Sequence, residues 1–326
     1  MRGSGQGCAG TVFTRRSRFL SRRVAERAQM KDVEGTAAQS AARLARESSI
    51  EVSFVEAADI RAGRDFLPPG RKVYVSHLPR QTWAQTRSMC AQVAAAGFDP
   101  VPHVPVRLLE SEQQLNDVLS SMRDAGAAEL LLISGDYVRP VGPYDQVLDV
   151  MRSGKLQTYG FTRISIAGHP EGHPGVPTDE IRCAQIQKSA WGSAAGMRVT
   201  LVTQFFFEAA PFIDWASDLR QSGVDARIVA GLAGPASIRK LLGLAKHCGV
   251  GPSIRALTSR SGVILKLFSD RNPDLLLDEL SREMHLQPSL LDGIHLYSFG
   301  GFLRTAAWLR QAAESPLEEL RVRGVC

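Results

Sequence analysis

Two histidines and a glutamate in the stretch ISIAGHPEGHPG (residues 164–175) have the residue types of a metal site. His169 and His173 are four residues apart, the spacing that places two zinc ligands on one face of a helix. A proline follows each histidine, however, and drives it towards extended geometry. No cluster of acids or cysteines accompanies them. We therefore expect no metal, and interpret His169, Glu171 and His173 as part of a stiff loop that binds an organic ligand.

Two carboxylates lie where an apolar strand is expected. Glu51 stands between Ile50 and Val52, and Asp136 ends the run LLLISGD. A carboxylate is rarely buried without a partner, and desolvation raises its pKa, as a general acid near neutral pH requires. Gly135 lets backbone and ligand approach closely beside Asp136. Both acids are candidate catalytic residues, although Asp136 could instead cap a turn and Glu51 could face solvent.

A neutral amide and an aromatic run follow a third apolar segment. Gln204 precedes three phenylalanines in LVTQFFFE. The amide offers donors and an acceptor that suit the edge of a heterocycle. Phe206, the middle ring, is a candidate for stacking on a flat ligand, although such a run is more often part of a core. Together these groups favour a planar nitrogen heterocycle over a phosphate or a metal.

The elements that must position these residues recur eight times. Short β-branched and apolar runs alternate with longer segments of helical periodicity, which predicts a parallel sheet covered on both faces. Eight such units fit a closed (β/α)8 TIM barrel in a single domain, and no GxGxxG follows the first run to indicate a Rossmann fold. An insertion at 250–288, with an extra helix near 273–284, precedes the last run. The strands are expected at 50–54, 72–76, 100–104, 129–134, 163–168, 198–204, 225–231 and 293–299.

Catalytic residues of such barrels lie at the carboxyl ends of the strands. This rule places the candidate residues at one end of the barrel. From the first to the eighth strand they are Glu51, Ser76 with His77, His103, Gly135 with Asp136, Ala167 and Gly168 with the histidine loop, Gln204, Gly231, and His295 with Tyr297.

The net positive charge of the chain comes from its first 30 residues. The net charge is +6, and residues 1–30 hold seven arginines against one acid, Glu26, which accounts for the whole excess. The rest is neutral overall, so no nucleic-acid partner is expected. We interpret residues 1–46 as an Arg-rich leader, flexible or partly helical, and residues 47–326 as the catalytic barrel. A transit peptide, a disordered leader, or a start at Met30 all fit this composition.

Cysteine usage and hydropathy bear on the compartment. No apolar run approaches the roughly 18 residues of a membrane span, so no membrane association is expected. The cysteines show no CxxC and no metal spacing, which indicates a reducing compartment, and we expect the cytoplasm. A homo-oligomer stays open. The five cysteines are Cys8, Cys90, Cys183, Cys248 and Cys326.

Three of these motifs together resemble one family. LLLISGD, IAGHPEGHP and LVTQFFFE fall in this order on the expected fourth, fifth and sixth strands. They resemble the methylenetetrahydrofolate reductases, flavoproteins with a (β/α)8 barrel, and the likeness extends from Ile50 to Leu309. The resemblance implies FAD as cofactor, NADH or NADPH as hydride donor, and 5,10-methylenetetrahydrofolate as the folate substrate that is reduced to 5-methyltetrahydrofolate.

The resemblance also implies roles for individual residues. Glu51, in IEVS, matches the general acid that helps to open the five-membered ring of the folate. Asp136 matches an aspartate that contacts the pterin and adjusts the flavin, and Gln204 matches a folate-binding glutamine, with Phe206 beside it. The expected cofactor contacts are His77, His103, Gly135, Asp136, Ala167, Gly168, His169, Glu171 and His173, with Lys188 near the cofactor phosphates.

The chain departs from the family pattern at three places. VSFVEA follows Glu51 in place of a Phe-Pro-Pro run, SHLPR follows the second strand, and Gly300 and Gly301 replace an Asn-Arg pair. A flavin-free reductase of the same folate, which takes hydride directly from NADH, therefore stays open. So do the oxidative direction in one-carbon catabolism, a non-catalytic folate- or flavin-binding protein, and a metal-dependent barrel lyase or hydrolase that uses His169, His173 and Asp136.

Overall fold

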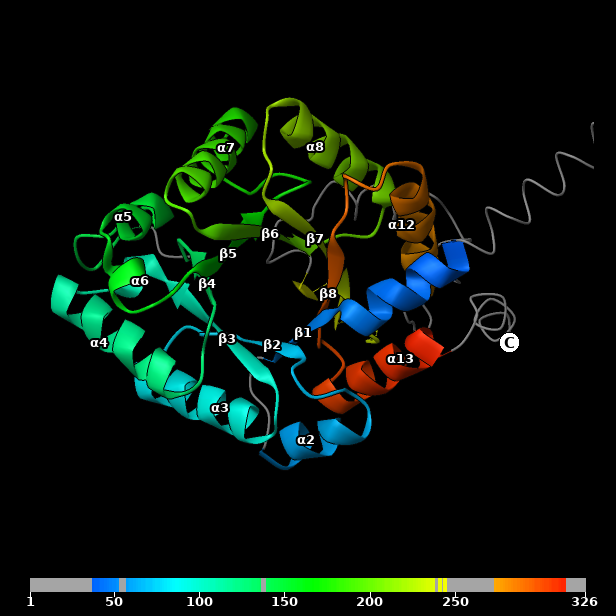
Figure 1. Ribbon diagram of the computed structural model, residues 1–326, viewed down its shortest axis with the longest axis horizontal. Coiled ribbons are helices and arrows are strands. Elements are labelled where there is room, and N and C mark those ends of the chain that lie inside the picture. The colour runs from blue at the N-terminus through cyan, green and yellow to red at the C-terminus, as the bar shows by residue number, and fades with distance from the viewer. Residues whose placement is uncertain are drawn as a thin grey trace, which may run out of the picture.

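Eight parallel strands close into the barrel that the alternation predicts (Figure 1). The computed structural model describes residues 37–52, 57–135, 139–237, 240–241, 243–244 and 273–314. Each strand pairs with its sequence neighbours, and β1 pairs with β8 to complete the ring. The strands are β1 (Ser49–Val52), β2 (Lys72–Val75), β3 (Asp99–Pro105), β4 (Leu130–Ile133), β5 (Arg163–Gly168), β6 (Arg198–Phe205), β7 (Arg227–Ala233) and β8 (Gly293–Tyr297).

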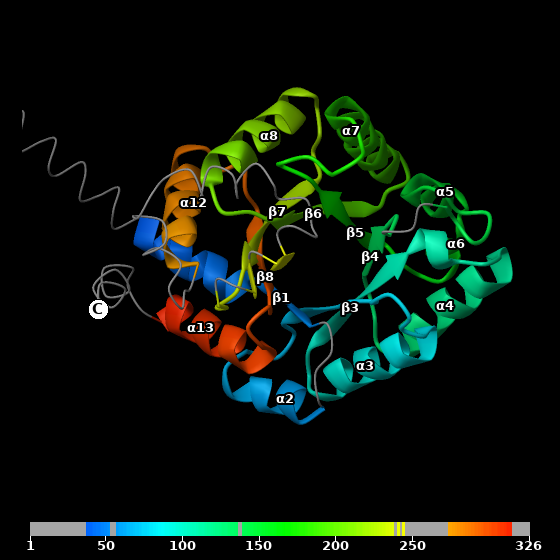
Figure 2. The same ribbon diagram turned by 180° about the vertical axis from the view of Figure 1, so that it is seen from behind.

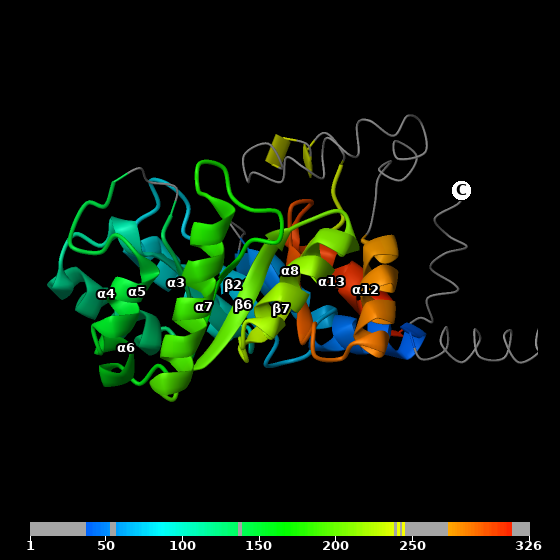
Figure 3. The ribbon, with the colours of Figure 1, turned by 90° about the horizontal axis from the view of Figure 1, so that it is seen from above.

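Helices surround the strands in an outer layer, as the views from behind and from the side show (Figures 2 and 3). The helix predicted within the insertion before the last strand is confirmed as α12, and the rest of that insertion up to residue 272 lies outside the described residues. No described helix is both long and apolar enough to cross a membrane. The helices labelled in Figure 1 are α2 (Ala57–Ala62), α3 (Trp83–Ala95), α4 (Glu112–Asp124), α5 (Val147–Arg152), α6 (Lys155–Thr158), α7 (Thr178–Ala194), α8 (Ala209–Gln221), α12 (Asp274–Leu286) and α13 (Phe302–Glu314), and 3-10 turns lie at Gly63–Asp65 and Val106–Leu108.

Side chains cap the starts of helices α3 and α4. Thr82 Oγ1 accepts a hydrogen bond from the backbone N–H of Gln85, and the Gln85 side-chain oxygen accepts one from the backbone N–H of Thr82, so that both orphan donors at the start of α3 are satisfied. Ser111 caps α4 through the N–H of Gln114. The predicted Ser start of this helix is confirmed.

Two apolar layers result from the period of two along each strand. Outward-facing residues such as Ile50, Leu132 and Ile164 pack against the helices in one large core. Inward-facing residues form a smaller cluster that fills the barrel interior: Tyr74, Val101, Leu131, Val202 and Val229, with Ile133 packed against it. The barrel is therefore a filled core and not a pore, and its polar interior residues are exceptions to explain.

A helix precedes the first strand of the barrel. Residues 37–47 form a helix, and Ala41, Leu44 and Ala45 are buried in the main core. Arg71 holds the end of this helix, because its Nη1 donates to the carbonyls of Ala45 and Ser48 at 3.1 and 2.6 Å. Residues 37–46, which the prediction assigns to the leader, are thus part of a helix packed in the main core; residues 1–36 lie outside the described residues.

Candidate active site

Glu51 points into the barrel, where side chains from three other strands converge on its carboxylate. Oε1 accepts a hydrogen bond from Ser76 Oγ at 2.7 Å, directly after β2. Oε2 lies 3.5 Å from Nε2 of His103 on β3 and 3.6 Å from Nε2 of His295 on β8. The carboxylate side chain is only 15% exposed. The inward orientation expected for Glu51 therefore holds, and the two imidazoles supply the partners that a buried acid needs.

The protonation of Glu51 differs from the expectation of a raised pKa. Burial raises the pKa of the carboxyl, but the neighbouring imidazoles of His103 and His295 and the Ser76 hydroxyl lower it by more, and the net pKa lies below its ordinary value. Glu51 is thus an anion at neutral pH in the free protein. As a general acid it must take a proton from a neighbour.

The two imidazoles are held by different neighbours. His295 is 1% exposed, and its Nδ1 is 2.8 Å from the Ser49 hydroxyl. His103 is buried too, and burial lowers its pKa by more than the Glu51 carboxylate raises it. The Tyr74 ring packs edge-on against both, with centroid distances of 6.2 Å to His103 and 4.6 Å to His295. Tyr74 therefore fixes the directions of both rings.

The loop after β5 places one histidine inward and one outward. His169 is half-buried, and burial lowers its pKa to about 4 while its Nδ1 has no hydrogen-bond partner. His173 is exposed, and its Nδ1 interacts with the Pro174 carbonyl. Their rings meet edge-on at 5.5 Å. Among the described residues no three histidine, cysteine, aspartate or glutamate side chains form a group that could hold a metal ion.

A lysine from the following helix faces the same loop. Lys188 on α7 is half-buried, and burial alone lowers its pKa to about 8. Its charge also lowers the pKa of His169, so the two side chains lie near each other. Ala167 and Gly168 end β5 beneath them, and a Cβ on Gly168 would come within 2.9 Å of the Trp215 ring. Glycine is required there because the helix side approaches the strand closely.

Gln204 lies one residue before the end of β6 and is hydrogen-bonded to the histidine loop. Its Nε2 donates to the carbonyl of Gly172 at 3.1 Å, while the amide carbonyl has no hydrogen bond among the described residues. The half-buried side chain thus joins the sixth strand to the loop that also carries Glu171, which is half-buried as well.

Phe206 is buried in the main core, where a ligand has no access to its ring. It is 1% exposed and stacks on Phe212 of α8, with ring centroids 5.2 Å apart and planes at 13°. It therefore fills the layer between barrel and helices, because the strand period turns it outward. The aromatic cluster at the carboxyl end of β6 to β8 consists instead of Phe205, Phe207, Tyr297 and Phe299.

The remaining predicted cofactor contacts are His77, Gly135 and Asp136. His77 is buried directly after β2, where Nδ1 is 2.8 Å from the Thr86 hydroxyl and the ring stacks on Trp83 at 4.2 Å. Burial lowers its pKa to about 4. Gly135 has a φ of 86°, a conformation that favours glycine. Asp136, the predicted second acid, lies outside the described residues.

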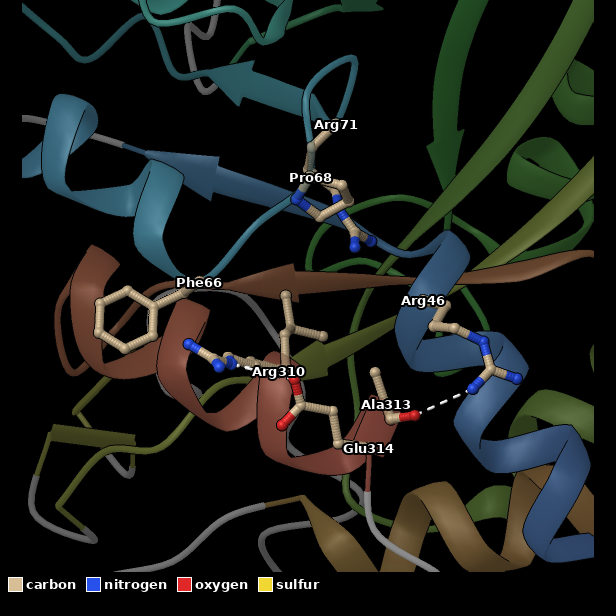
Figure 4. A pocket seen from close by; sticks show the side chains of 8 residues that line it. Arg46, Phe66, Pro68, Arg71, Arg310, Ala313 and Glu314 are labelled. Atoms are coloured by element: carbon tan, nitrogen blue, oxygen red, sulfur yellow. Dashed lines mark hydrogen bonds and ion pairs between the residues drawn. The ribbon is translucent and has the colours of Figure 1, made fainter.

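Two cavities lie at the other end of the barrel, where the strands begin. One, of about 380 Å³, is bounded by Arg46, Phe66, Arg71 and Arg310, and there Arg46 donates to the Ala313 carbonyl at 2.9 Å (Figure 4). The other, of about 350 Å³, is lined by residues at or near the starts of the strands. These residues include Ser49, Lys72, Thr200, Arg227 and Gly293.

The geometry thus brings together a hydroxyl and two imidazoles around the Glu51 carboxylate, while Gln204 and the aromatic cluster lie at the carboxyl ends of β6 to β8. Sequence reasoning assigned no role to Ser49, and gave His295 none beyond its place at the end of the eighth strand. The arrangement can donate one proton to a nitrogen or oxygen of a bound molecule, and it can hold a heterocycle by its edge through Gln204.

Comparison with known proteins identifies the family of the chain. A model of the methylenetetrahydrofolate reductase family matches residues 79–254, more than half of the chain. "Methylenetetrahydrofolate reductase 2" of Saccharomyces cerevisiae is 27% identical over 125 residues, which cover 36% of this chain and 20% of the yeast protein. The Arabidopsis thaliana protein "Methylenetetrahydrofolate reductase (NADH) 1" is 25% identical over 149 residues, 42% of this chain and 25% of its own length.

A bacterial relative matches a larger share of its own chain. The "5,10-methylenetetrahydrofolate reductase" of Pectobacterium carotovorum is 23% identical over 145 residues, 44% of this chain and 47% of that protein. In each relative the match spans less than half of the relative's length. On the match of the family model, with its closed (β/α)8 barrel, the chain belongs to the methylenetetrahydrofolate reductase family.

Proposed function

We propose that the protein is an oxidoreductase that reduces 5,10-methylenetetrahydrofolate to 5-methyltetrahydrofolate with hydride from NADH or NADPH. The observation that carries the proposal is the buried Glu51 carboxylate, held by Ser76 Oγ at 2.7 Å and approached by two imidazoles at the mouth of the barrel. Membership of the family supports the substrate class.

The chemistry assigns Glu51 one proton per turnover. Opening the five-membered ring of the folate breaks the bond between the methylene carbon and N10, and the electron pair stays on N10, which takes up a proton. The methylene carbon becomes part of an iminium cation with N5, and the hydride completes the methyl group. Glu51 is the acid that supplies N10, and Asp136 is proposed to favour the cation by its negative charge. Gln204 is proposed to bind the edge of the pterin.

The β5 end of the mouth fits a phosphate-bearing cofactor. Lys188 is half-buried without a carboxylate partner among the described residues, and the neighbouring His169 has an unpartnered, buried Nδ1. A cation and a donor left open in this way suit the pyrophosphate of FAD. We propose that Lys188, His169, Ala167 and the following loop hold FAD, together with His103. A bound flavin would accept hydride from NAD(P)H and pass it on.

The same site also fits the alternatives within the reaction class. A protein without flavin would place the nicotinamide dinucleotide against Lys188 and pass hydride directly. The oxidative direction uses the same groups in reverse, with Glu51 as the base. Cytoplasmic location and a homo-oligomeric state stay predictions.

The experiment is a spectrum followed by turnover. Purified protein is expected to show flavin absorbance that NADH or NADPH bleaches and methylenetetrahydrofolate restores. Glu51→Gln should lower kcat about 10²- to 10⁴-fold, because it removes the acid and keeps the shape. Glu47→Gln makes the same chemical change on an exposed side chain and should leave kcat unchanged.

Three outcomes would contradict parts of the proposal. Colourless protein that oxidises NADH only with methylenetetrahydrofolate supports the flavin-free reaction and overturns FAD. Stoichiometric zinc or manganese without NADH oxidation favours a lyase or hydrolase. Full turnover by Glu51→Gln removes Glu51 from the chemistry.

A further inference from the structure

We propose that the amino-terminal end of the barrel carries a binding site for a dianionic phosphoryl group, centred on the Arg71 guanidinium where the two cavities meet. The ligand is inorganic phosphate or the phosphate of a small monoester. The site lies at the end of the barrel opposite the mouth, so the inference does not depend on the proposed function. It rests on a buried arginine with open donors, on two further arginines without a carboxylate partner, and on the space beside them.

Arg71 uses only part of its guanidinium within the protein. It directly precedes β2 and is buried, with 7% of its surface exposed. Its Nη1 donates to the carbonyls of Ala45 and Ser48 and to the Ser48 hydroxyl, at 3.1, 2.6 and 2.9 Å. Its Nε has no hydrogen-bond partner, and its Nη2 makes no hydrogen bond within the described part of the chain. Two of the three guanidinium nitrogens are therefore open to another acceptor.

The charge of Arg71 is not balanced by an acid. Burial lowers the pKa of the guanidinium to about 10, which leaves it charged at pH 7, and no carboxylate among the described residues forms an ion pair with it. A buried charge without an opposite charge costs free energy. The last carbonyls of helix 37–47 offset part of this cost through Nη1. An anion bound at Nε and Nη2 would offset more of it.

The two cavities at this end of the barrel share the Arg71 side chain. Arg46, Pro68 and Arg71 line both the cavity of about 380 Å³ and the cavity of about 350 Å³. In Figure 4, Arg71 and Arg46 reach the first cavity from the start of β2 and from helix 37–47, and Phe66 lies on the other side. Either volume exceeds that of a phosphate group several times, so a monoester can place its organic part beside the Phe66 ring.

Two more arginines that line these cavities lack an acid partner. Among the described residues, Arg46 donates only to the Ala313 carbonyl at 2.9 Å, and Arg227, at the start of β7, donates only to the Asp292 carbonyl at 3.3 Å. The other charged side chains that line the cavities are already in ion pairs. These pairs are Lys72 with Glu129 at 2.6 Å, Arg310 with Glu314 at 3.0 Å, and Glu47 with Arg43 at 3.9 Å.

The open donors fit a phosphoryl group better than a carboxylate. The planar fork of a guanidinium matches the oxygens of both groups. A carboxylate carries one negative charge and two oxygens, whereas a phosphate monoester carries about 1.5 to 2 negative charges at pH 7 and three terminal oxygens. Arg46, Arg71 and Arg227 bring three positive charges without a counter-charge to this space, so a dianion balances more of the charge than a carboxylate does.

A binding titration tests the site. The full chain, freed of phosphate by dialysis, is titrated by calorimetry in about 0.1 M sodium chloride, once with inorganic phosphate and once with glucose 6-phosphate. We expect saturable binding with a dissociation constant of about 1 mM or below. Tighter binding of glucose 6-phosphate would identify a monoester as the ligand, and tighter binding of inorganic phosphate would identify the free ion. Acetate at equal concentration should displace neither, and displacement by acetate would overturn the phosphoryl assignment.

Variants of the exposed arginines place the binding without disturbing the buried one. Arg46→Gln and Arg227→Gln should each weaken binding about threefold to fivefold, as the loss of an exposed charge predicts. Arg43→Gln makes the same change in charge on an exposed arginine of helix 37–47 that lines neither cavity, and it should bind as the wild type does. Arg71→Lys keeps the charge and loses the fork, so binding should weaken about tenfold or more, with a urea titration to check the fold.

Four results would overturn the site. The first is the absence of saturable binding of either phosphoryl ligand. The second is unchanged affinity in both Arg46→Gln and Arg227→Gln. The third is equal weakening in Arg43→Gln and Arg46→Gln, which would show attraction by net charge alone. The fourth is loss of binding in Lys188→Met with full binding in Arg46→Gln, which would place the phosphate at the mouth.

Discussion

Two neighbouring phenylalanines should respond oppositely to the same substitution. Phe206 is 1% exposed and stacks on Phe212 at 5.2 Å, whereas Phe207 is half-buried and meets Phe205 edge-on at 5.7 Å in the aromatic cluster at the mouth. Phe206→Leu loses the ring pair, worth about 0.5–1.5 kcal/mol, and leaves an imperfectly filled site. We expect the free energy of unfolding to fall by about 1–3 kcal/mol in total, with unchanged affinity for folate.

Phe207→Leu supplies the matched control. The side chain is partly exposed, so we expect a loss of less than about 1 kcal/mol in the free energy of unfolding. Because the ring lies at the mouth, the dissociation constant for a folate should rise severalfold. Urea unfolding and fluorescence titration with a folate measure both quantities on the same samples. If Phe206→Leu weakens folate binding and leaves stability unchanged, the placement of its ring in the outer core is wrong.

Further predictions concern charge and burial. Arg71→Met should lower the free energy of unfolding by about 2–4 kcal/mol in urea, because it leaves the carbonyls at the end of helix 37–47 without a donor; Arg46→Met, which loses one exposed bond, should cost less than about 1 kcal/mol. Burial holds the pKa of His77 and His169 near 4 against 6.5 in the unfolded chain, so stability is full above pH 6.5 and falls as the pH drops towards 4. His77 contributes at most about 3 kcal/mol to this loss, and a urea series at pH 7.5 and 5 showing equal stability would contradict it. Binding of FAD or NADH, followed by fluorescence, should weaken above pH 8 as Lys188 loses its proton, and Lys188→Met should bind more weakly with no change between pH 7 and 9.

The barrel was predictable because its signals are local. The period of two in a strand and the Ser cap of α4 each depend on residues that are close together in the sequence. Both ends of every observed strand lie within two residues of the predicted ends. The same periodicity placed Glu51 inward. Composition grouped residues 37–46 with the Arg-rich leader, and only the structure shows that Ala41, Leu44 and Ala45 are buried in the main core.

The meeting of side chains from distant strands was decided by the tertiary structure alone. No spacing joins Ser49 to His295, which are 246 residues apart and become neighbours only when β1 pairs with β8 to close the ring. The lowered pKa of Glu51 has the same origin, since burial acting alone would raise it and imidazoles from β3 and β8 reverse the direction. Phe206 likewise could not be assigned from its run of three rings, because the face that each ring takes depends on where the strand ends. The residue types that could do chemistry were therefore in the sequence, whereas their charge states and contacts were set by barrel closure.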